Sequence, residues 1–445
     1  MGTAAAGQAE TGADRRTAVV VGASGFIGSA VVARLKRDGL RVIALVRDTD
    51  SAARRLFADG LRALDLGDAR RCEDWLPFVA GADIVINCAG VLQSGQRDST
   101  RIVHEEAPTA LFEACERAKV RRLIHFSAMG ADGTPLSDFS RSKGRAEATL
   151  SASRLDWVIL RPSVVVGRSA YGGSALFRGL ASLPFLPRLP DTGRISVVQL
   201  DDVAETVARL ASPDAAAHVA LDLVGPEQMT FEGIVARYRR WFGWPPARPI
   251  VLPPALMNLA YRLGDLAGWL GWRPPIRSNA RLEAARGAAG DPAAWKEATG
   301  IVPRSLDAAL QAEPASVQER WFARLFLLKP LVIGVFAFFW LLTGAVSIGP
   351  GYDIGVALMR EGGAGALSGP SVIAGGLADL AIGAGILWRR TSKTALWAAL
   401  AITLFYVVAG TALLPRLWEE PLGPMMKVWP ILVLNLVALA ILDER

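Results

Sequence analysis

The sequence has 445 residues, which is too long for one ordinary domain, and its apolar residues are unevenly distributed. Hydrophobic residues make up 51% of the chain, and the long charge-free runs all lie beyond Leu325. We therefore expect a soluble front and a membrane-embedded tail. The net charge of +7 comes from arginines scattered through apolar helices and flanking the apolar runs, so the composition argues against a nucleic-acid-binding protein.

Three cysteines, Cys72, Cys88 and Cys115, share no metal-ligand or redox spacing. This pattern argues against a metal site and a disulfide framework, and it fits a reducing compartment. Residues 1–16 are rich in Ala, Gly and Thr and lack the apolar core of a signal peptide. They are predicted to form a disordered leader, which leaves the N-terminus inside the cell.

A strand, a glycine turn and a helix open the structured part of the chain. Thr17–Val21 predicts a strand, the segment GASGFIG of residues 22–28 a turn, and residues 29–38 a helix that ends at a glycine. Gly22 permits a tight turn, Gly25 lets a pyrophosphate approach the helix N-terminus, and Gly28 allows close packing of helix on strand. The sequence therefore predicts a dinucleotide-binding turn, with Ser24, Phe26 and Ile27 beside the glycines.

The second strand, Arg41–Val46, ends in Arg47, where an NAD-binding protein usually carries an acid for the ribose hydroxyls. An arginine suits the 2′-phosphate of NADP, so NADP is favoured over NAD. Two alternatives stay open: Arg47 is a solvated or adenine-stacking charge, or the next residue, Asp48, holds the ribose of NAD.

Four further strands are predicted at residues 61–64, 82–87, 122–126 and 157–160, and a helix at residues 107–119. The predicted fold is an α/β Rossmann fold with a doubly wound parallel sheet. Ligands of such sheets bind outside the carboxyl ends of the strands. We therefore expect Asp65 and Leu66 beside adenine, and Ala89 and Gly90 under the ribose. Proline is expected to free the chain from the sheet at Pro162, so that Pro162 and Ser163 close over the nicotinamide end.

Across residues 17–230 the segments VVGASGFIG, NCAG, HFSAMGADG, SRSKGRAE, VILRPSVVVG and QLDDVAE, in this order, resemble the extended and atypical short-chain dehydrogenase/reductase superfamily. Within it the chain is most similar to the branch of NmrA-like proteins and the nucleotide-binding accessory subunit of respiratory complex I. The resemblance implies a small substrate lobe, expected at about residues 168–195 and 225–315.

The same resemblance implies a catalytic Ser, Tyr and Lys. Ser127 and Lys143 stand at the matching places, but Phe139 occupies the position of the Tyr, and phenylalanine cannot transfer a proton. His104 is a candidate for the missing proton transfer because the pKa of histidine lies near neutrality, and the alternative is a histidine on a helix surface. The sequence therefore predicts cofactor binding with weak or absent ordinary dehydrogenase turnover.

Four apolar runs are predicted to cross the membrane, at residues 325–346, 372–388, 395–414 and 428–442. Basic residues precede the first span and fill the connection between the second and third spans. Positive charge favours the cytoplasmic side, so we expect these two segments, and the Rossmann domain, to face the cytoplasm. The tail resembles the DoxX-like family, which implies a link to quinone or membrane redox systems. Asp379 lies within the second span, where it is either a proton or quinone site or a hydrogen-bonded structural group.

These observations predict three parts: the leader, an NAD(P)-binding domain with its substrate lobe at residues 17–318, and a four-helix transmembrane domain at residues 319–445. The first hypothesis is a multi-pass protein of the inner (plasma) membrane that binds NAD(P)H and passes electrons to a small-molecule or quinone acceptor. The alternative is a non-catalytic NADPH-binding scaffold or assembly factor for a membrane redox complex. A membrane sugar-nucleotide epimerase ranks last, because it also needs the absent Tyr.

Overall fold

The computed structural model describes residues 15–92, 94–95, 99–133, 137–189, 192–421 and 423–443. All but the last two residues of the predicted leader lie outside this range. The chain forms two compact units, Met1–Tyr261 with Pro275–Ala315, and Arg262–Pro274 with Ser316–Arg445. The second unit thus includes a short segment, 262–274, that the sequence had placed in the substrate lobe.

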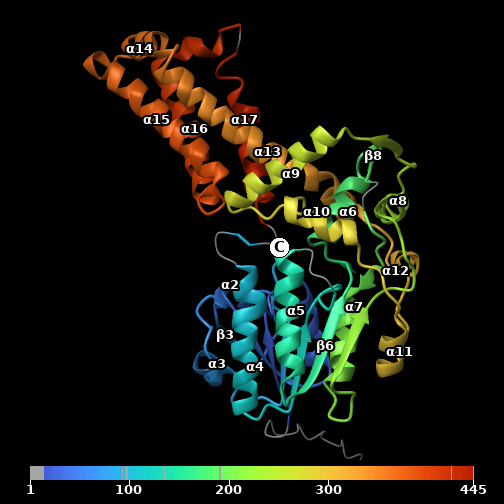
Figure 1. The fold of residues 1–445 in the computed structure, drawn as a ribbon. Helices are drawn as coiled ribbons and strands as arrows, with labels where there is room; N and C mark the ends of the chain where they lie inside the picture. The colour runs from blue at the N-terminus through green and yellow to red at the C-terminus, as the bar shows by residue number, and fades with distance from the viewer. Residues whose placement is uncertain are drawn as a thin grey trace, which may run out of the picture. The chain divides into compact units, whose positions relative to one another are not determined.

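A seven-stranded parallel sheet forms the centre of the first unit (Figure 1), with the strand order β10-β6-β5-β4-β1-β2-β3. Its strands are β1 (Thr17–Val21), β2 (Arg41–Val46), β3 (Gly60–Ala63), β4 (Ile84–Asn87), β5 (Arg122–Phe126), β6 (Asp156–Pro162) and β10 (Val219–Leu223). The chain reverses its direction of winding at β1, which pairs with both β2 and β4. Ligands of such sheets bind outside the carboxyl ends of the strands at this switch point.

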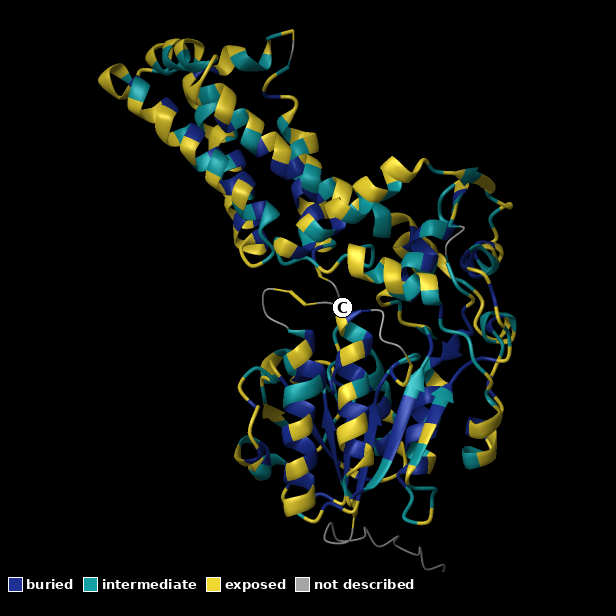
Figure 2. Cartoon of the chain, viewed as in Figure 1, coloured by how far each residue is buried: buried dark blue, intermediate teal, exposed yellow. Residues whose placement is uncertain are grey.

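Helices cover both faces of the sheet, as expected for strands that are apolar on both sides. One face packs against α3 (Cys72–Val79), α4 (Ala107–Arg117) and α5 (Asp138–Ser151), and Trp75, Leu111 and Leu123 are buried there. The other face packs against α1 (Phe26–Arg37) and α7 (Leu200–Leu210). The central strands β1, β2, β4 and β5 are almost wholly buried between these layers, and the edge strands β3 and β10 are more exposed (Figure 2).

The predicted Rossmann fold is confirmed, and three strands, β1, β2 and β5, have the predicted bounds. Two details differ. The first helix begins at Phe26, inside the glycine segment, because Gly25 serves as its N-cap. Pro162 does not leave the sheet: it is the last residue of β6 and pairs with Leu223 of β10, a strand that the sequence did not reveal.

A smaller set of elements follows β6 and β10 in the first unit. It contains two short parallel strand pairs, β7 with β9 and β8 with β11, and a helix α8 that packs on α6. The bounds are β7 (Val165–Val166), α6 (Gly173–Ala181), β8 (Phe185–Arg188), β9 (Val198–Gln199), α8 (Phe231–Trp241), β11 (Arg248–Val251), α9 (Pro254–Trp269), α10 (Ser278–Arg286), α11 (Ala293–Thr299) and α12 (Leu306–Ala312).

In the second unit, three helices of the described part are long and apolar enough to cross a membrane: α13 (Val317–Ile348), α15 (Ser368–Leu387) and α16 (Ser392–Leu413). The fourth predicted span, α17 (Val428–Ala440), has 13 residues and is apolar but short. At 1.5 Å per residue it is about 20 Å long, against about 30 Å of hydrocarbon. A further helix, α14 (Tyr352–Glu361), was not predicted.

The helices of this unit alternate in direction. Lys329, in the first half of α13, donates hydrogen bonds from Nζ to the carbonyl oxygens of Leu442 (3.1 Å) and Asp443 (3.2 Å), just past α17. Arg389, just past α15, donates to the same Leu442 oxygen at 3.5 Å. The first half of α13, at Lys329, and the ends of α15 and α17 therefore lie together, and this region carries basic residues noted in the sequence.

Candidate functional site

The turn between β1 and α1 has the geometry of a phosphate-binding turn. Gly22 has a φ of +70°, a conformation that favours glycine, and the amide of Gly25 donates to the Gly22 carbonyl at 2.9 Å. Gly25 then caps α1, whose first turn has no acidic residue. The positive end of the helix therefore faces the carboxyl edge of the sheet without a side-chain anion, as a pyrophosphate site requires.

Two glycines of this turn are required by close packing. A Cβ on Gly28 would lie 2.3 Å from the Gly22 carbonyl oxygen, and one on Gly22 would lie 3.0 Å from the Ala89 backbone. The turn after β1 and the turn after β4 are thus in direct contact. This contact brings Gly22, Gly28 and Ala89, three of the predicted cofactor-binding residues, close together.

The other predicted members of the turn have different surroundings. Ile27 packs against the apolar core beneath α1, and Ser24 is half-buried in the turn. The ring of Phe26 lies 6.1 Å from that of Tyr171, which precedes α6. The pair links the glycine turn to the smaller set of elements, and no local sequence pattern indicates this contact.

At the end of β2, Arg47 and Asp48 are both exposed. Asp48 caps α2 (Thr49–Ala53) by accepting a hydrogen bond from the Ser51 amide at 2.9 Å. Its carboxylate is therefore already engaged in the role that such residues commonly take at helix starts. Arg47 lies at the strand end where the sequence placed a phosphate-binding charge.

The turns after β3 and β4 are held by their own side chains. Asp65 accepts from the Gly67 amide at 2.9 Å and is exposed, while Leu66 is partly buried against the core. Asn87, the last residue of β4, accepts from the Ala89 amide at 3.1 Å and bonds to His125 at 3.2 Å. Asn87 thus shapes the backbone that leads to Gly90.

Lys143 on α5 reaches the carboxyl edge of the sheet. Its Nζ donates to the carbonyl oxygen of Phe126, the last residue of β5, at 2.6 Å, and to that of Ala89, which follows β4, at 3.5 Å. A Cβ on Gly90 would lie 3.8 Å from this Nζ. The side chain is 3% exposed, and burial lowers the pKa of Lys143 to about 8. The ammonium therefore lies beside the predicted ribose position.

His104 lies beside Lys143, but both of its ring nitrogens are engaged. Nε2 accepts from the Val91 amide at 3.0 Å, and Nδ1 contacts the Ser142 hydroxyl at 3.1 Å. Since Nε2 is an acceptor, the proton of the neutral ring is on Nδ1 and is donated to Ser142. Burial, aided by the Lys143 charge, lowers the pKa of His104 well below its usual value. This geometry favours a structural histidine over the predicted proton donor.

The orientation of His104 depends on an irregular helix. Residues Ile102–Glu106 form a π-helical turn, η1, directly before α4. The turn directs the imidazole into the protein, where it is fully buried and meets the ring of Phe139 edge-on at 5.3 Å. Phe139 is itself half-buried near the start of α5.

Ser127 follows β5 directly and is 6% exposed. Among the described residues, its hydroxyl has no hydrogen-bond partner. Its neighbour Phe126 provides the carbonyl that binds Lys143, so the serine and the lysine lie at the same strand end. An unpaired buried hydroxyl is costly, and such groups in native structures commonly serve a ligand.

Beyond β6 the site is covered by the segment after α10. Ser163 donates from Oγ to the Ala288 carbonyl at 2.6 Å, and its amide donates to Leu223 at 3.0 Å. Arg286 donates to the Met129 carbonyl at 2.6 Å. The end of α10 and the residues after it, 283–290, therefore lie over the ends of β5, β6 and β10, where Pro162 and Ser163 were expected to close over the nicotinamide end.

An ion-pair cluster that the sequence did not reveal lies beside this cover. Arg161 of β6 forms hydrogen bonds with Glu147 of α5 (2.6 Å) and with Asp132 (2.6 Å), and Asp222 of β10 is 3.8 Å away. Arg161 and Glu147 are nearly buried. This network joins α5, which carries Lys143, to the edge of the sheet.

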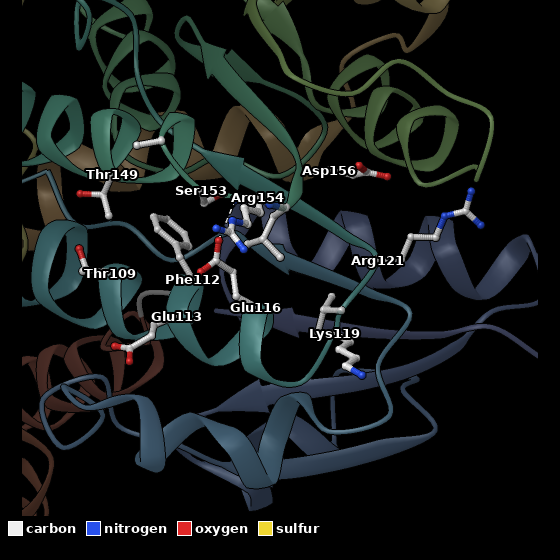
Figure 3. A pocket seen from close by; sticks show the side chains of 13 residues that line it. Thr109, Phe112, Glu113, Glu116, Lys119, Arg121, Thr149, Ser153, Arg154 and Asp156 are labelled. Atoms are coloured by element: carbon white, nitrogen blue, oxygen red, sulfur yellow. Dashed lines mark hydrogen bonds between the residues drawn. The ribbon is translucent and has the colours of Figure 1, made fainter.

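A hollow of the first unit is unrelated to these residues (Figure 3). It is lined by side chains near the starts of β5 and β6 and the ends of α4 and α5, among them Glu116, Arg154 and Asp156. This is the amino edge of the sheet, opposite the glycine turn. Because dinucleotides bind at the carboxyl edge, the hollow is not the candidate cofactor site.

In the second unit Asp379 of α15 is 3% exposed, and the Tyr406 hydroxyl of α16 donates to its carboxylate at 3.4 Å. Asn435 of α17 is also buried and donates to the Leu396 carbonyl at 3.1 Å. Both polar groups thus face the interior of the bundle, as is usual for such groups in membrane helices.

Comparison with protein families is decisive for both units. Residues 22–212 match the family described as NAD(P)H-binding, and residues 337–436 match the DoxX-like family. The chain combines an NAD(P)H-binding domain with a DoxX-like domain. The NAD(P)H-binding domain has a Rossmann-like fold shared with solved epimerase structures, and its relatives include subunits of NADH-ubiquinone oxidoreductase.

Two curated relatives match the NAD(P)H-binding domain. Ceramide reductase of Caulobacter vibrioides is 29% identical over 191 residues, which are 43% of this chain and 59% of that protein. The mitochondrial NADH-ubiquinone oxidoreductase 40 kDa subunit of Neurospora crassa is 29% identical over 224 residues, which are 48% of this chain and 57% of that protein. The chain therefore spans less than two thirds of the length of these relatives.

Solved structures share the fold. UDP-glucuronic acid 4-epimerase from Bacillus cereus, in complex with UDP-glucuronic acid and NAD, has a TM-score of 0.50 and 18% identity, and the match covers 69% of this chain and 99% of that chain. Pal from Bacillus thuringiensis has a TM-score of 0.52 and 16% identity over 69% of this chain and 99% of that chain. At this identity the likeness concerns the fold alone.

Proposed function

We propose that this protein is a membrane-anchored oxidoreductase that uses NAD(P)H to reduce an acceptor supplied by the membrane. The observation that supports it is the Ser127 hydroxyl, which is buried at the strand end where Lys143 is bound and has no hydrogen-bond partner in the described part of the chain. Leaving such a hydroxyl unpaired costs about 1–3 kcal/mol, so a ligand oxygen is its natural partner. A site used only to hold the nucleotide by its phosphates would not need this hydroxyl.

When bound, NAD(P)H supplies a hydride. The turn from Gly22 to Gly28 binds the pyrophosphate, and Ser127 donates a hydrogen bond to the acceptor oxygen. Lys143, with a pKa of about 8, carries a proton at neutral pH and releases it more readily than an ordinary lysine. Lys143 is therefore the proton source that this site offers in place of the absent tyrosine.

The nucleotide of this proposal is NADP. Asp48, the acid that could hold the ribose hydroxyls of NAD, already caps α2. Arg47 lies beside it and supplies the positive charge that a 2′-phosphate binds. Together the two residues favour NADPH over NADH.

The acceptor in this proposal is a quinone or a carbonyl lipid. The relatives whose names include a ceramide reductase and an NADH-ubiquinone oxidoreductase subunit support a membrane-borne acceptor. The buried Asp379, which accepts from the Tyr406 hydroxyl, offers a polar site on the bundle helices. We place the protein in the inner (plasma) membrane with the nucleotide domain in the cytoplasm, because basic residues lie in the first half of α13 and follow α15.

The second candidate function is a non-catalytic, NADPH-stabilised scaffold for a membrane redox complex. It is favoured by Phe139, which replaces the usual acid, and by His104, whose nitrogens are both engaged. In this alternative the unpaired Ser127 hydroxyl would bind the nicotinamide amide.

The test follows the fluorescence of NADPH bound to the full chain in detergent after addition of a soluble quinone and then of a carbonyl panel. We expect the signal to decay, and Ser127→Ala to lower kcat about 100-fold while the Kd for NADPH stays the same. Ser212→Ala, at the opposite edge of the sheet, is the matched control. A signal that is stable with every acceptor would overturn the proposal and support the scaffold.

Asp379→Asn tests the part that the bundle plays. We expect it to slow oxidation by the quinone and not by a water-soluble carbonyl, whereas Asp353→Asn, on α14, should change neither. Equal rates for Asp379→Asn and the unaltered protein with the quinone would show that the bundle is an anchor only.

A further inference from the structure

Helix α9 carries a row of exposed leucines. Leu256, Leu259, Leu263 and Leu266 are each 49–56% exposed. At about 100° per residue these four positions fall within about 80° of one another on the helix surface. The helix therefore presents one continuous apolar stripe to its surroundings, which single scattered leucines would not do.

The remainder of α9 has two other faces. Gly264 and Gly268 are its buried residues, so this side packs against the protein. Asn258, Arg262 and Asp265 gather on a separate polar arc, and the first two are exposed. The helix is thus apolar on one part of its exposed surface and polar on another, as expected of a helix that lies at the boundary between lipid and water.

The C-terminal half of α9 belongs to the membrane unit. Trp269 meets the ring of Trp388 at 5.7 Å, and Trp272 donates from its indole to the Leu387 carbonyl at 2.7 Å. The amide of Arg389 donates to the Leu270 carbonyl at 3.0 Å. These contacts fasten α9 to the end of the apolar helix α15, where tryptophans and arginines mark the level of the lipid headgroups.

The charges on and after α9 indicate which kind of surface the helix contacts. Residues 254–287 contain five arginines and only two acidic residues. Arg389 also lies over the ring of Trp272, at 5.4 Å from its centroid. Clustered arginines beside an apolar helix face are attracted to anionic headgroups.

We propose that α9 lies along the cytoplasmic surface of an anionic bilayer, with its leucine stripe in the acyl boundary and its polar arc in water. The continuity of the stripe with the membrane unit argues for lipid as the occupant. A second copy of the chain or another protein is the competing occupant, and the experiment separates them.

The test uses the full chain in lipid nanodiscs containing phosphatidylglycerol, with photoreactive benzoylphenylalanine in place of one residue at a time. Substitution at Leu259 probes the stripe, and substitution at the neighbouring exposed residue Asn258 is the matched control. Phe338 of α13, which is 62% exposed on an apolar span, is the positive control for lipid labelling. The Kd for NADPH of each variant shows that it has folded.

We expect lipid adducts at Leu259 with a yield at least about fivefold above Asn258, and a lower yield in nanodiscs of phosphatidylcholine alone. Adducts between two protein chains at Leu259 would overturn the proposal in favour of a protein partner. Equal labelling of Leu259 and Asn258, or no lipid adduct at Leu259 while Phe338 is labelled, would also overturn it. None of these outcomes depends on whether the protein oxidises NADPH.

Discussion

Gly28→Ala tests whether the glycine turn binds the nucleotide. The added methyl would lie 2.3 Å from the Gly22 oxygen, whereas ordinary contacts begin at 3.4 Å, so α1 must move by about 1 Å. The neighbouring atoms are backbone and cannot rotate away, and overpacking of this kind costs about 1–3 kcal/mol of stability. The same shift displaces the amides that would bind the pyrophosphate, and we expect the Kd for NADPH to rise about 10- to 100-fold, or about 1.4–2.7 kcal/mol.

The assay is a fluorescence titration of the purified chain with NADPH, together with a thermal unfolding curve. Gly173→Ala is the control, because the added methyl at the start of α6 would meet only a Val164 methyl, at 3.5 Å. The control should keep the Kd of the unaltered protein. If Gly28→Ala binds NADPH as tightly as the unaltered protein does, the turn is not the pyrophosphate site and the reasoning fails.

Three further predictions concern neighbouring residues. Arg47→Glu should weaken NADPH binding by about 10- to 100-fold, because a charge-assisted bond of about 1.5–3 kcal/mol is lost, and should leave NADH binding unchanged in the same titration. If Lys143 supplies the proton, kcat should be level below pH 7 and fall as pH rises through about 8, and a flat kcat profile would exclude it as the donor. Because the ordinary pKa of lysine is 10.5, the contribution of Lys143 to the free energy of unfolding should rise between pH 8 and 10.5, as measured by denaturant titrations. Phe139→Tyr should raise the reduction of a carbonyl at least about tenfold by restoring a phenol one helical turn before Lys143, and no gain would show that this ring does not reach the acceptor.

The front of the fold was predictable because its signals are local. The β1 strand, the spacing of Gly22, Gly25 and Gly28, and the strand end at Arg47 all follow from short patterns of the sequence. The structure brings Ala89, Gly90 and Lys143 to the same edge of the sheet, as the strand order requires. These positions depend on topology, which the sequence indicated correctly.

Other parts depend on contacts between distant residues and could not be predicted. The strand β10 lies more than fifty residues after its partner β6 and keeps Pro162 in the sheet, against the local tendency of proline to leave it. The role of His104 depends on the Val91 amide and the Ser142 hydroxyl, which only the fold brings near. The position of residues 283–290 over the strand ends also depends on contacts between residues far apart in the sequence, such as that of Ser163 with Ala288.

In the tail, hydropathy located the apolar runs but overestimated the length of the last helix. The predicted span at residues 428–442 contains the helix α17 of 13 residues, which is too short to cross the hydrocarbon without tilt or local thinning. Its buried Asn435 is bonded to α16, a contact that hydropathy cannot reveal.

The π turn at Ile102–Glu106 has a consequence for comparing this chain with its relatives. Such a turn holds one residue more than a regular helical turn, so it is equivalent to a single inserted residue. Without the insertion, the helix before it would be rotated by about 100°, and another side chain would occupy the place of His104. An alignment that opens no gap here would pair side chains that point in different directions, and a histidine shared at this column would not by itself mean a shared role.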